Sequence, residues 1–283
     1  EPEERGEILA AADALAARRH AAACQTDLIE FCKHMQPNYK VGKHHRILAD
    51  LLMQIALGNK DRLCVNIPPR HGKSQLVSIY FPAWFIGKYP NKKVMMVSHT
   101  TDLAVDFGRK VRNLIDTPAY RAIFPTVSLA ADSKSAGRWN TNVGGEYYAC
   151  GIGSALAGRG ADIVIIDDPH TEQEALQAAF NPGIYDKVYE WYTTGPRQRL
   201  QPGGAIIIVM TRWSLRDLTG QVLAWIEVGL PDADRLHRAS KRAGRVAVYT
   251  HRDVRQLLSQ LEGARIHRAA DIPVRAFPRT TID

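Results

Sequence analysis

Two kinds of hydrophobic pattern alternate along the chain. Short runs of consecutive apolar residues are typical of strands buried on both faces, and they occur at 63–67, 93–98, 162–167 and 205–210. Segments whose apolar residues recur every three or four positions predict helices at 7–20, 24–35, 44–57, 101–116, 171–179, 184–193 and 214–226. Strands that alternate with helices predict an α/β fold with a mainly parallel central sheet flanked by helices.

Residues 126–160 do not follow this alternation. Asn142-Val143-Gly144-Gly145 is a hairpin signal between segments rich in aromatic residues, so we expect a β-rich insertion here. A glycine-rich loop that contains Arg159 follows it.

The first apolar run leads into Pro68-Pro69-Arg70-His71-Gly72-Lys73-Ser74, and an apolar-rich segment follows. A strand, a tight loop ending in Gly-Lys-Ser and a helix are the context of a phosphate-binding loop, which we expect at Pro69 to Ser74. Lys73 would supply a charge for the β- and γ-phosphates, and the Ser74 hydroxyl a ligand for Mg²⁺. Ile67 replaces the first glycine of the motif, and proline has no N–H to donate. An exposed turn before a helix is the alternative for so short a motif.

A second candidate motif, a pair of aspartates, lies at the end of the apolar run at 162–167. Asp167, at the tip of the predicted strand, can hold Mg²⁺ directly or through water. Asp168 is placed to orient or deprotonate the attacking water. Thr211, at the tip of another strand, could hydrogen-bond the γ-phosphate or that water. The alternative for the two aspartates is a pair that caps the next helix.

Four polar residues, Lys73, Ser98, Asp167 and Thr211, lie at or just past the ends of apolar runs. The carboxyl ends of parallel strands meet at one edge of a sheet, and ligands bind there. The sequence therefore favours an ATPase or GTPase that uses a nucleotide and Mg²⁺.

The net charge of the chain indicates which class of partner it would bind. The 283 residues carry a net charge of +8 and a pI near 9.4, which favours an acidic partner such as nucleic acid. Four cysteines show no C-x-x-C pair and no histidine spacing suited to zinc, so we expect buried reduced thiols in a cytosolic protein. The acidic start is unlike a signal peptide, and no apolar segment is long enough to span a bilayer, so no membrane partner is expected.

Four segments together resemble a known family. IPPRHGKS, VMMVSHTTDLAVDFGRKVR, GSALAGRGADIVIIDDPH and AIIIVMTRWSLRDLTG, in this order, are similar to the ATPase domain of the large terminase subunit of tailed bacteriophages and prophages. The resemblance covers about residues 30–226. It implies an additional-strand P-loop NTPase fold, like that of RecA and helicases, and Mg²⁺-dependent ATP hydrolysis that drives double-stranded viral DNA into a procapsid.

The resemblance also implies roles for single residues. Lys73 and Ser74 would be the Walker A pair, and Arg70 the additional arginine of that loop. Asp167 would be the Walker B metal ligand, and Asp168 takes the catalytic position, where many relatives have glutamate. Thr211 would belong to the coupling motif. Arg159 would be an arginine finger acting on a neighbouring subunit or, equally, a DNA-facing or solvated residue; Arg197 and Arg199 are weaker candidates.

The partners implied by the resemblance are the portal protein, the small terminase subunit and further copies of the chain in a ring on the portal. The protein would then work in the bacterial host cytoplasm and transiently on the procapsid. We expect an N-terminal helical segment at 1–42, the ATPase domain at 43–228 and a basic tail at 229–283.

The tail is the main departure from the family. Large terminases carry a second, nuclease domain, and the stretch after Ile226 is too short for one, so no nuclease activity is expected. The stretch from residue 231 on contains eleven Lys and Arg and six Asp and Glu, so it carries a net positive charge. A short strand is expected at 246–248. Two other functions remain open: a helicase-like DNA-dependent ATPase, and a truncated prophage relic that binds DNA without catalysis.

Overall fold

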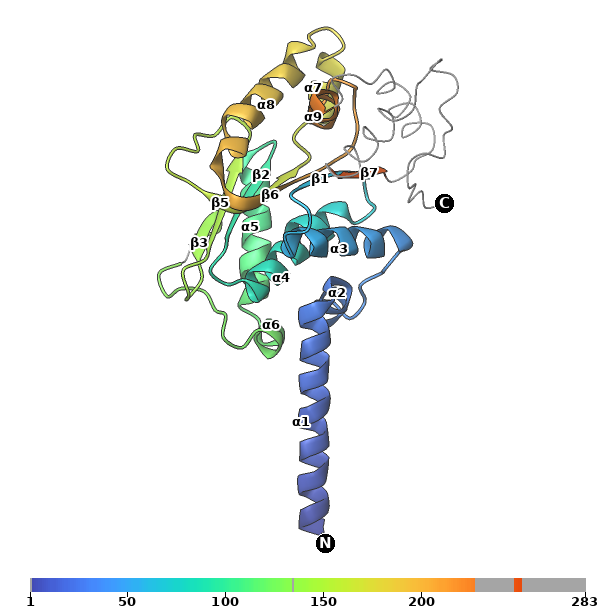
Figure 1. The fold of residues 1–283 in the computed structure, drawn as a ribbon, viewed down its shortest axis with the longest axis vertical. Coiled ribbons are helices and arrows are strands. Elements are labelled where there is room, and N and C mark those ends of the chain that lie inside the picture. Colours follow the sequence, from blue (N-terminus) through green and yellow to red (C-terminus); the bar gives the residue numbers. More distant parts are fainter. Residues whose placement is uncertain (1, 134, 227–246, 251–283) are drawn as a thin grey trace.

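The computed structural model describes residues 2–133, 135–226 and 247–250. At its centre is a seven-stranded sheet in the order β3-β4-β2-β5-β6-β1-β7 (Figure 1). The five inner strands run parallel, and β3 and β7 are antiparallel at the two edges. The strands are β1 (Arg62–Asn66), β2 (Lys93–Ser98), β3 (Arg138–Asn140), β4 (Glu146–Gly151), β5 (Ala161–Asp167), β6 (Leu200–Met210) and β7 (Ala247–Thr250).

Helices cover both faces of the sheet (Figure 1). They are α1 (Pro2–Thr26), α2 (Leu28–Met35), α3 (Lys43–Ala56), the π-helix η1 (Gln75–Tyr80), α4 (Phe81–Lys88), α5 (Thr101–Ile115), α6 (Pro118–Ile123), α7 (Glu172–Gln177), α8 (Gly183–Thr194), the 3₁₀-helix η2 (Pro196–Arg199) and α9 (Leu218–Ile226). Among the described residues, no helix is long and apolar enough to cross a membrane.

Alternation along the strands explains why their sequences are continuously apolar. In β5, Ile163 and Ile165 pack into one hydrophobic cluster with residues of α2 to α6, whereas Val164 and Ile166 pack into a second with residues of α8 and α9. Successive side chains of a strand point to opposite faces, so a sheet with helices on both faces needs apolar residues at every position. The predicted α/β architecture is confirmed.

The order of the strands defines the subclass of the fold. β6 lies between β1 and β5 and pairs in parallel with both. A strand inserted between the phosphate-loop strand and the acidic strand is the additional strand that the sequence predicts. β6 begins earlier than expected, because Gly203, with φ 78°, and a register shift near Ala161 let the chain pass through 202–204 without leaving the sheet.

The boundary between the first two helices differs from the prediction. α1 continues to Thr26, because three alanines after His20 favour helix. The break comes at Asp27, whose Oδ1 accepts hydrogen bonds from the N–H groups of Ile29 and Glu30 and so caps α2. The first part of α1 projects from the body of the protein (Figure 1).

The hairpin at 142–145 is confirmed, but the expected β-rich insertion is not a separate unit. β4 pairs in parallel with β2 along six positions and so belongs to the central sheet, while β3 pairs antiparallel with β4. At the other edge, β7 corresponds to the short strand expected in the tail and pairs antiparallel with β1.

Candidate nucleotide site

The loop after β1 combines two residues in the left-handed region. Gly72 has φ 75°, which glycine adopts without steric cost. Arg70 has φ 63°, an uncommon conformation for a residue with a Cβ, and such residues cluster at functional sites. The Leu76 N–H donates to the Gly72 carbonyl at 3.1 Å, so the helical turn begins inside the loop.

Histidines from the start of α3 hold this loop. His45 Nδ1 accepts from the Gly42 N–H at 3.0 Å, so its Nε2 carries the proton and donates to the His71 carbonyl at 3.1 Å. His44 Nε2 lies 3.1 Å from the same carbonyl oxygen. Since the C=O and N–H of one peptide unit point in opposite directions, the Gly72 N–H points away from α3. Burial lowers the pKa of His45, helped by the neighbouring His44, so the neutral ring is favoured.

Lys73 is buried, and its ammonium reaches the other strand tips. Its Nζ donates to Asp168 Oδ2 at 2.6 Å and to Thr211 Oγ1 at 3.3 Å. Asp168 Oδ1 in turn accepts from the Thr211 N–H at 2.9 Å, which fixes the carboxylate in place. The side chain of Asp168 remains one-third exposed, so it can still meet a ligand. Its φ of 41° is tolerated better by aspartate than by most residues.

Asp167 is held by two serines that are four residues apart on one helical face. Ser74 Oγ donates to Asp167 Oδ1 at 3.1 Å, and Ser78 Oγ donates to Oδ2. The backbone carbonyl of Asp167 accepts from Ser98 Oγ at 2.9 Å. Both carboxylate oxygens therefore have a hydroxyl partner, and the strand tip is fixed from two sides.

The raised pKa of Asp167 indicates that the site holds too little positive charge to balance its carboxylates. Burial and, to a smaller extent, the adjacent Asp168 raise the pKa of the Asp167 carboxyl, whereas Ser78, Ser74 and Lys73 lower it, and the net result is a pKa of about 7. Two neighbouring carboxylates face one lysine, so a second cation would relieve their repulsion. Ser74 Oγ and Asp167 Oδ1 are hard oxygen ligands of the kind Mg²⁺ prefers, and the residues present fit this ion.

The four predicted strand-tip residues therefore come together in one place, as the fold rules predict. Lys73, Asp168 and Thr211 are linked to one another by hydrogen bonds, and Ser74 and Ser98 both bind Asp167. The adjacent positions 73–74 and 167–168 join the two groups. The exposed side chains of Arg70 and His71 complete the loop beside them.

The three arginine candidates lie elsewhere in the fold. Arg159 stacks on Tyr148, with its guanidinium carbon 3.9 Å from the ring centre, and lies 3.7 Å from Glu146 Oε1. Glu146 begins β4, so this arginine lies at the amino end of the sheet, away from the Lys73 cluster of its own chain. Arg197 and Arg199 lie on η2, directly before β6, also at the amino ends of the strands.

Three residues that contribute to this site were not predicted in their observed roles. Ser78 lies inside an apolar helix and is fully buried; its signal is a spacing of four residues from Ser74. His44 and His45, at the start of α3, also contribute, since both rings contact the His71 carbonyl of the loop. Nothing local in the sequence marks a histidine ring as the partner of a carbonyl far along the chain.

The sheet with its inserted strand, together with the Gly-Lys-Ser loop, defines a P-loop NTPase fold. Residues 64–197 match the family model described as "Terminase large subunit, T4likevirus-type, N-terminal". These residues are therefore similar to the N-terminal part of terminase large subunits. Residues 212–283 match a second family model, described as "YaeQ protein". Comparison with curated proteins gives no match.

Two solved structures match part of the chain. The large terminase of bacteriophage HK97 is 15% identical, with a TM-score of 0.45 over 70% of this chain. A variant of the ATPase domain of the Thermus phage P74-26 large terminase is 14% identical, with a TM-score of 0.36 over 69% of this chain and 91% of that domain. The match covers 38% of the HK97 protein, so the chain corresponds to well under half of that relative.

Proposed function

We propose that this chain is the ATP-hydrolysing part of a DNA-packaging motor, in which Mg²⁺-dependent hydrolysis drives the translocation of double-stranded DNA. The observation that carries the proposal is the meeting of Lys73, Ser74, Asp167 and Asp168 at the carboxyl edge of the sheet. The terminase family match over the same part of the chain supports it.

The phosphate-binding role rests on the loop. The Gly72 N–H, turned away from α3 by the contacts of His44 and His45, would donate to a phosphate oxygen, and Arg70 and His71 flank the opening. The Lys73 ammonium would exchange its partner Asp168 for the β- and γ-phosphates. Ser74 and Asp167 would hold Mg²⁺, which would neutralise charge on the phosphates.

The hydrolytic role would fall to Asp168. With Lys73 engaged by phosphate, its carboxylate is free to orient a water molecule and accept the proton, while the Thr211 N–H keeps it in position. Thr211 Oγ1 contacts Lys73 as well, so this residue meets both the phosphate side and the water side of the site. We propose that it reports hydrolysis to the rest of the motor.

The partners follow from the family. We propose double-stranded DNA, a portal protein, a small terminase subunit and further copies of the chain as partners, in the bacterial cytoplasm. In such a ring Arg159, distant from its own site, would contact a neighbouring subunit or DNA. We keep the division into a helical segment at 1–42, an ATPase domain at 43–228 and a basic tail at 229–283 as part of this proposal.

The test is ATP turnover by the purified chain with and without Mg²⁺. Lys73→Ala and Asp167→Ala should abolish turnover while circular dichroism shows an intact fold. Lys88→Ala, at an exposed lysine at the end of α4, is the control and should turn over ATP normally. Unchanged turnover in both site variants would exclude the assignment.

Two rival functions give different outcomes. A non-catalytic relic would bind nucleotide with little turnover, and its DNA affinity would fall steeply with salt whether or not ATP is present. A helicase-like ATPase would unwind duplex DNA without any procapsid component. A packaging motor would hydrolyse ATP and fail to unwind.

A further inference from the structure

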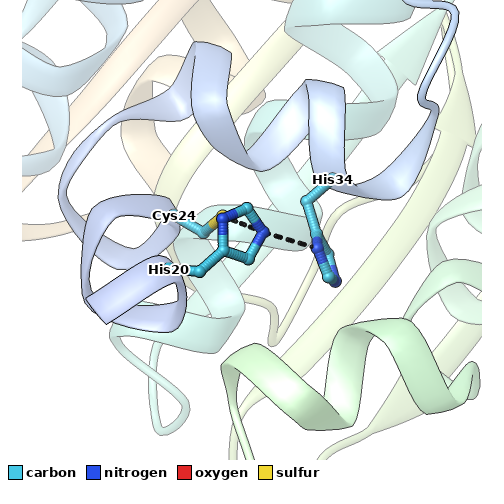
Figure 2. Close-up of side chains that lie close together, drawn as sticks. All are labelled: His20, Cys24 and His34. Atoms are coloured by element: carbon cyan, nitrogen blue, oxygen red, sulfur yellow. Dashed lines mark hydrogen bonds between the residues drawn. The ribbon is translucent and has the colours of Figure 1, made fainter. Parts of the chain in front are cut away.

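A second cluster of metal-binding side chains lies where α1 meets α2. Figure 2 shows the rings of His20 and His34 and the sulfur of Cys24 directed toward one another. His20 Nε2 lies 2.9 Å from His34 Nδ1 and 3.6 Å from Cys24 Sγ, and one ligand atom of each residue lies within 4.8 Å of the other two. The nucleotide site uses none of the three residues.

The sequence brings these residues together through two helices and one turn. His20 and Cys24 are four residues apart in α1, so their side chains lie on the same face. The break at Asp27 reverses the chain, and His34 in the last turn of α2 then faces them. The sequence has no histidine spacing of the kind usual for zinc sites. His20 and Cys24 are instead four residues apart on one helix, a spacing that those patterns do not include.

Two of the three separations are close to those of a tetrahedral metal site. Zn–N bonds of about 2.0–2.1 Å and a Zn–S bond of about 2.3 Å imply separations of about 3.3 Å between two nitrogens and about 3.6 Å between nitrogen and sulfur. The observed nitrogen–sulfur distance of 3.6 Å matches, and the nitrogen–nitrogen distance of 2.9 Å requires only a small shift of one ring.

Neighbouring groups orient the ligands. His34 Nε2 lies 3.0 Å from the Ala119 carbonyl oxygen, so it carries a proton and leaves the Nδ1 lone pair facing His20. A backbone carbonyl that binds the outer nitrogen of a histidine is the usual second contact of a metal ligand. Cys24 is fully buried, and its own carbonyl accepts from Trp84 Nε1 at 2.9 Å, which anchors this turn of α1 to α4.

The carboxylates near the cluster would attract a cation, and the cluster is accessible from solvent. Burial raises the pKa of the Cys24 thiol to about 11, with Glu30 and Asp27 adding to the effect, so a bound metal must displace the thiol proton. The same two carboxylates would attract a cation. His20 is exposed and His34 half-buried, so the cluster opens to solvent on one side.

We propose that His20, Cys24 and His34 bind a divalent transition-metal ion of the zinc type, with a fourth position open to water or another ligand. Imidazole and thiolate ligands select such ions over Mg²⁺, which prefers oxygen. The metal would join the last turn of α1 to α2 and so set the direction of the projecting helix. A metal-free cluster, in which His20 Nε2 donates its proton to His34 Nδ1, is the competing description.

The experiment is a titration of the purified, chelator-treated full chain with Co²⁺, in the presence of excess Mg²⁺ to occupy carboxylate sites. The proposal expects one Co²⁺ per chain, a thiolate-to-cobalt charge-transfer band, the visible absorption of a tetrahedral ion and displacement by Zn²⁺. Absence of stoichiometric binding, or binding without the thiolate band, would overturn it.

Variants identify the ligands. Cys24→Ser should remove the charge-transfer band, and His20→Ala should weaken Co²⁺ binding by about tenfold or more, the loss that even an outer contact of a metal ligand causes. His20 is exposed, so its substitution leaves the core intact and keeps the test valid if Cys24→Ser misfolds. Cys150→Ser, at a buried thiol on β4, should bind like the unmodified chain. A band lost in Cys150→Ser or unchanged affinity in His20→Ala would assign the metal elsewhere.

Discussion

Lys73 Nζ lies 2.6 Å from Asp168 Oδ2, although the two residues are 95 positions apart in the sequence. The loop after β1 supplies the ammonium and the tip of β5 the carboxylate, and β6 separates the two strands in the sheet. This ion pair therefore joins the two halves of the candidate nucleotide site. An anionic phosphate would compete for Lys73 and release Asp168, which links nucleotide binding to the availability of the proposed base.

The first prediction concerns this proposed base. Asp168→Asn should lower ATP turnover by about 10²–10⁴-fold, the contribution of a positioned acid or base. Nucleotide affinity should not fall, because phosphate no longer competes with a charged carboxylate for Lys73. Asparagine tolerates the φ of 41° at this position, so the backbone should remain in place. Turnover and nucleotide affinity are measured on the same preparations. Retained turnover would remove Asp168 from the proposed chemistry.

The second prediction concerns Ser78, which donates to Asp167 Oδ2 from η1. Ser78→Ala leaves one oxygen of buried Asp167 without its hydroxyl donor, which should cost about 1–3 kcal/mol of stability. Because this hydrogen bond lowers the pKa of Asp167, its loss should also raise that pKa. Urea unfolding measures the first effect. Ser128→Ala, at an exposed serine, is the control and should be close to neutral.

The third prediction is a pH dependence. The pKa of Asp167 is raised from 3.8 to about 7 in the folded chain, so between these values the folded state binds more protons than the unfolded state. Stability contributed by the protonated carboxyl is then lost as pH rises through this window. Without metal, the unmodified chain should lose stability relative to Asp167→Asn between about pH 4 and pH 7.

This difference should shrink when Mg²⁺ is added, because a bound cation favours the charged carboxylate. Urea unfolding of both chains across the pH range, with and without Mg²⁺, gives the comparison, since the two proteins differ only at position 167. A difference that grows with Mg²⁺ would contradict the assignment of Asp167 as a metal ligand.

The fourth prediction separates backbone strain from a steric clash. A Cβ on Gly72, with φ 75°, would lie 2.6 Å from His45 Nε2, whereas a Cβ on Gly58, with φ 74°, would meet nothing within 4 Å. Both alanine variants carry a similar left-handed strain of about 1–2 kcal/mol. Gly72→Ala should therefore be the less stable in urea unfolding and should bind nucleotide more weakly. Equal effects would argue against the support of the loop by His45.

Much of the sheet could be predicted because its residues carry local signals. The runs that became β2 and β5 are continuously apolar at 94–97 and 163–166, and their ends mark the edge where Asp167 and Lys73 meet. The extent of β6 could not be predicted, since Pro202-Gly203-Gly204 is a turn signal and only pairing with β5 keeps it in the sheet. The membership of β4 in the sheet likewise depends on pairing with a strand distant in sequence.

The candidate site could be predicted only in part for a related reason. Lys73, Asp167 and Thr211 follow strands, so the topology of the sheet is enough to bring them together. Ser78 and His45 act through side-chain contacts across elements, and their own neighbourhoods in the sequence do not indicate them. The cluster of His20, Cys24 and His34 likewise depends on how α1 and α2 meet.

The most direct measurement is a crystal structure of the chain with Mg²⁺ and a non-hydrolysable ATP analogue. We expect the triphosphate at the loop, with Lys73 on its β- and γ-phosphates and released from Asp168, and Mg²⁺ on Ser74 and Asp167. A nucleotide bound elsewhere, or a bound triphosphate that leaves the Lys73–Asp168 ion pair unbroken, would contradict it.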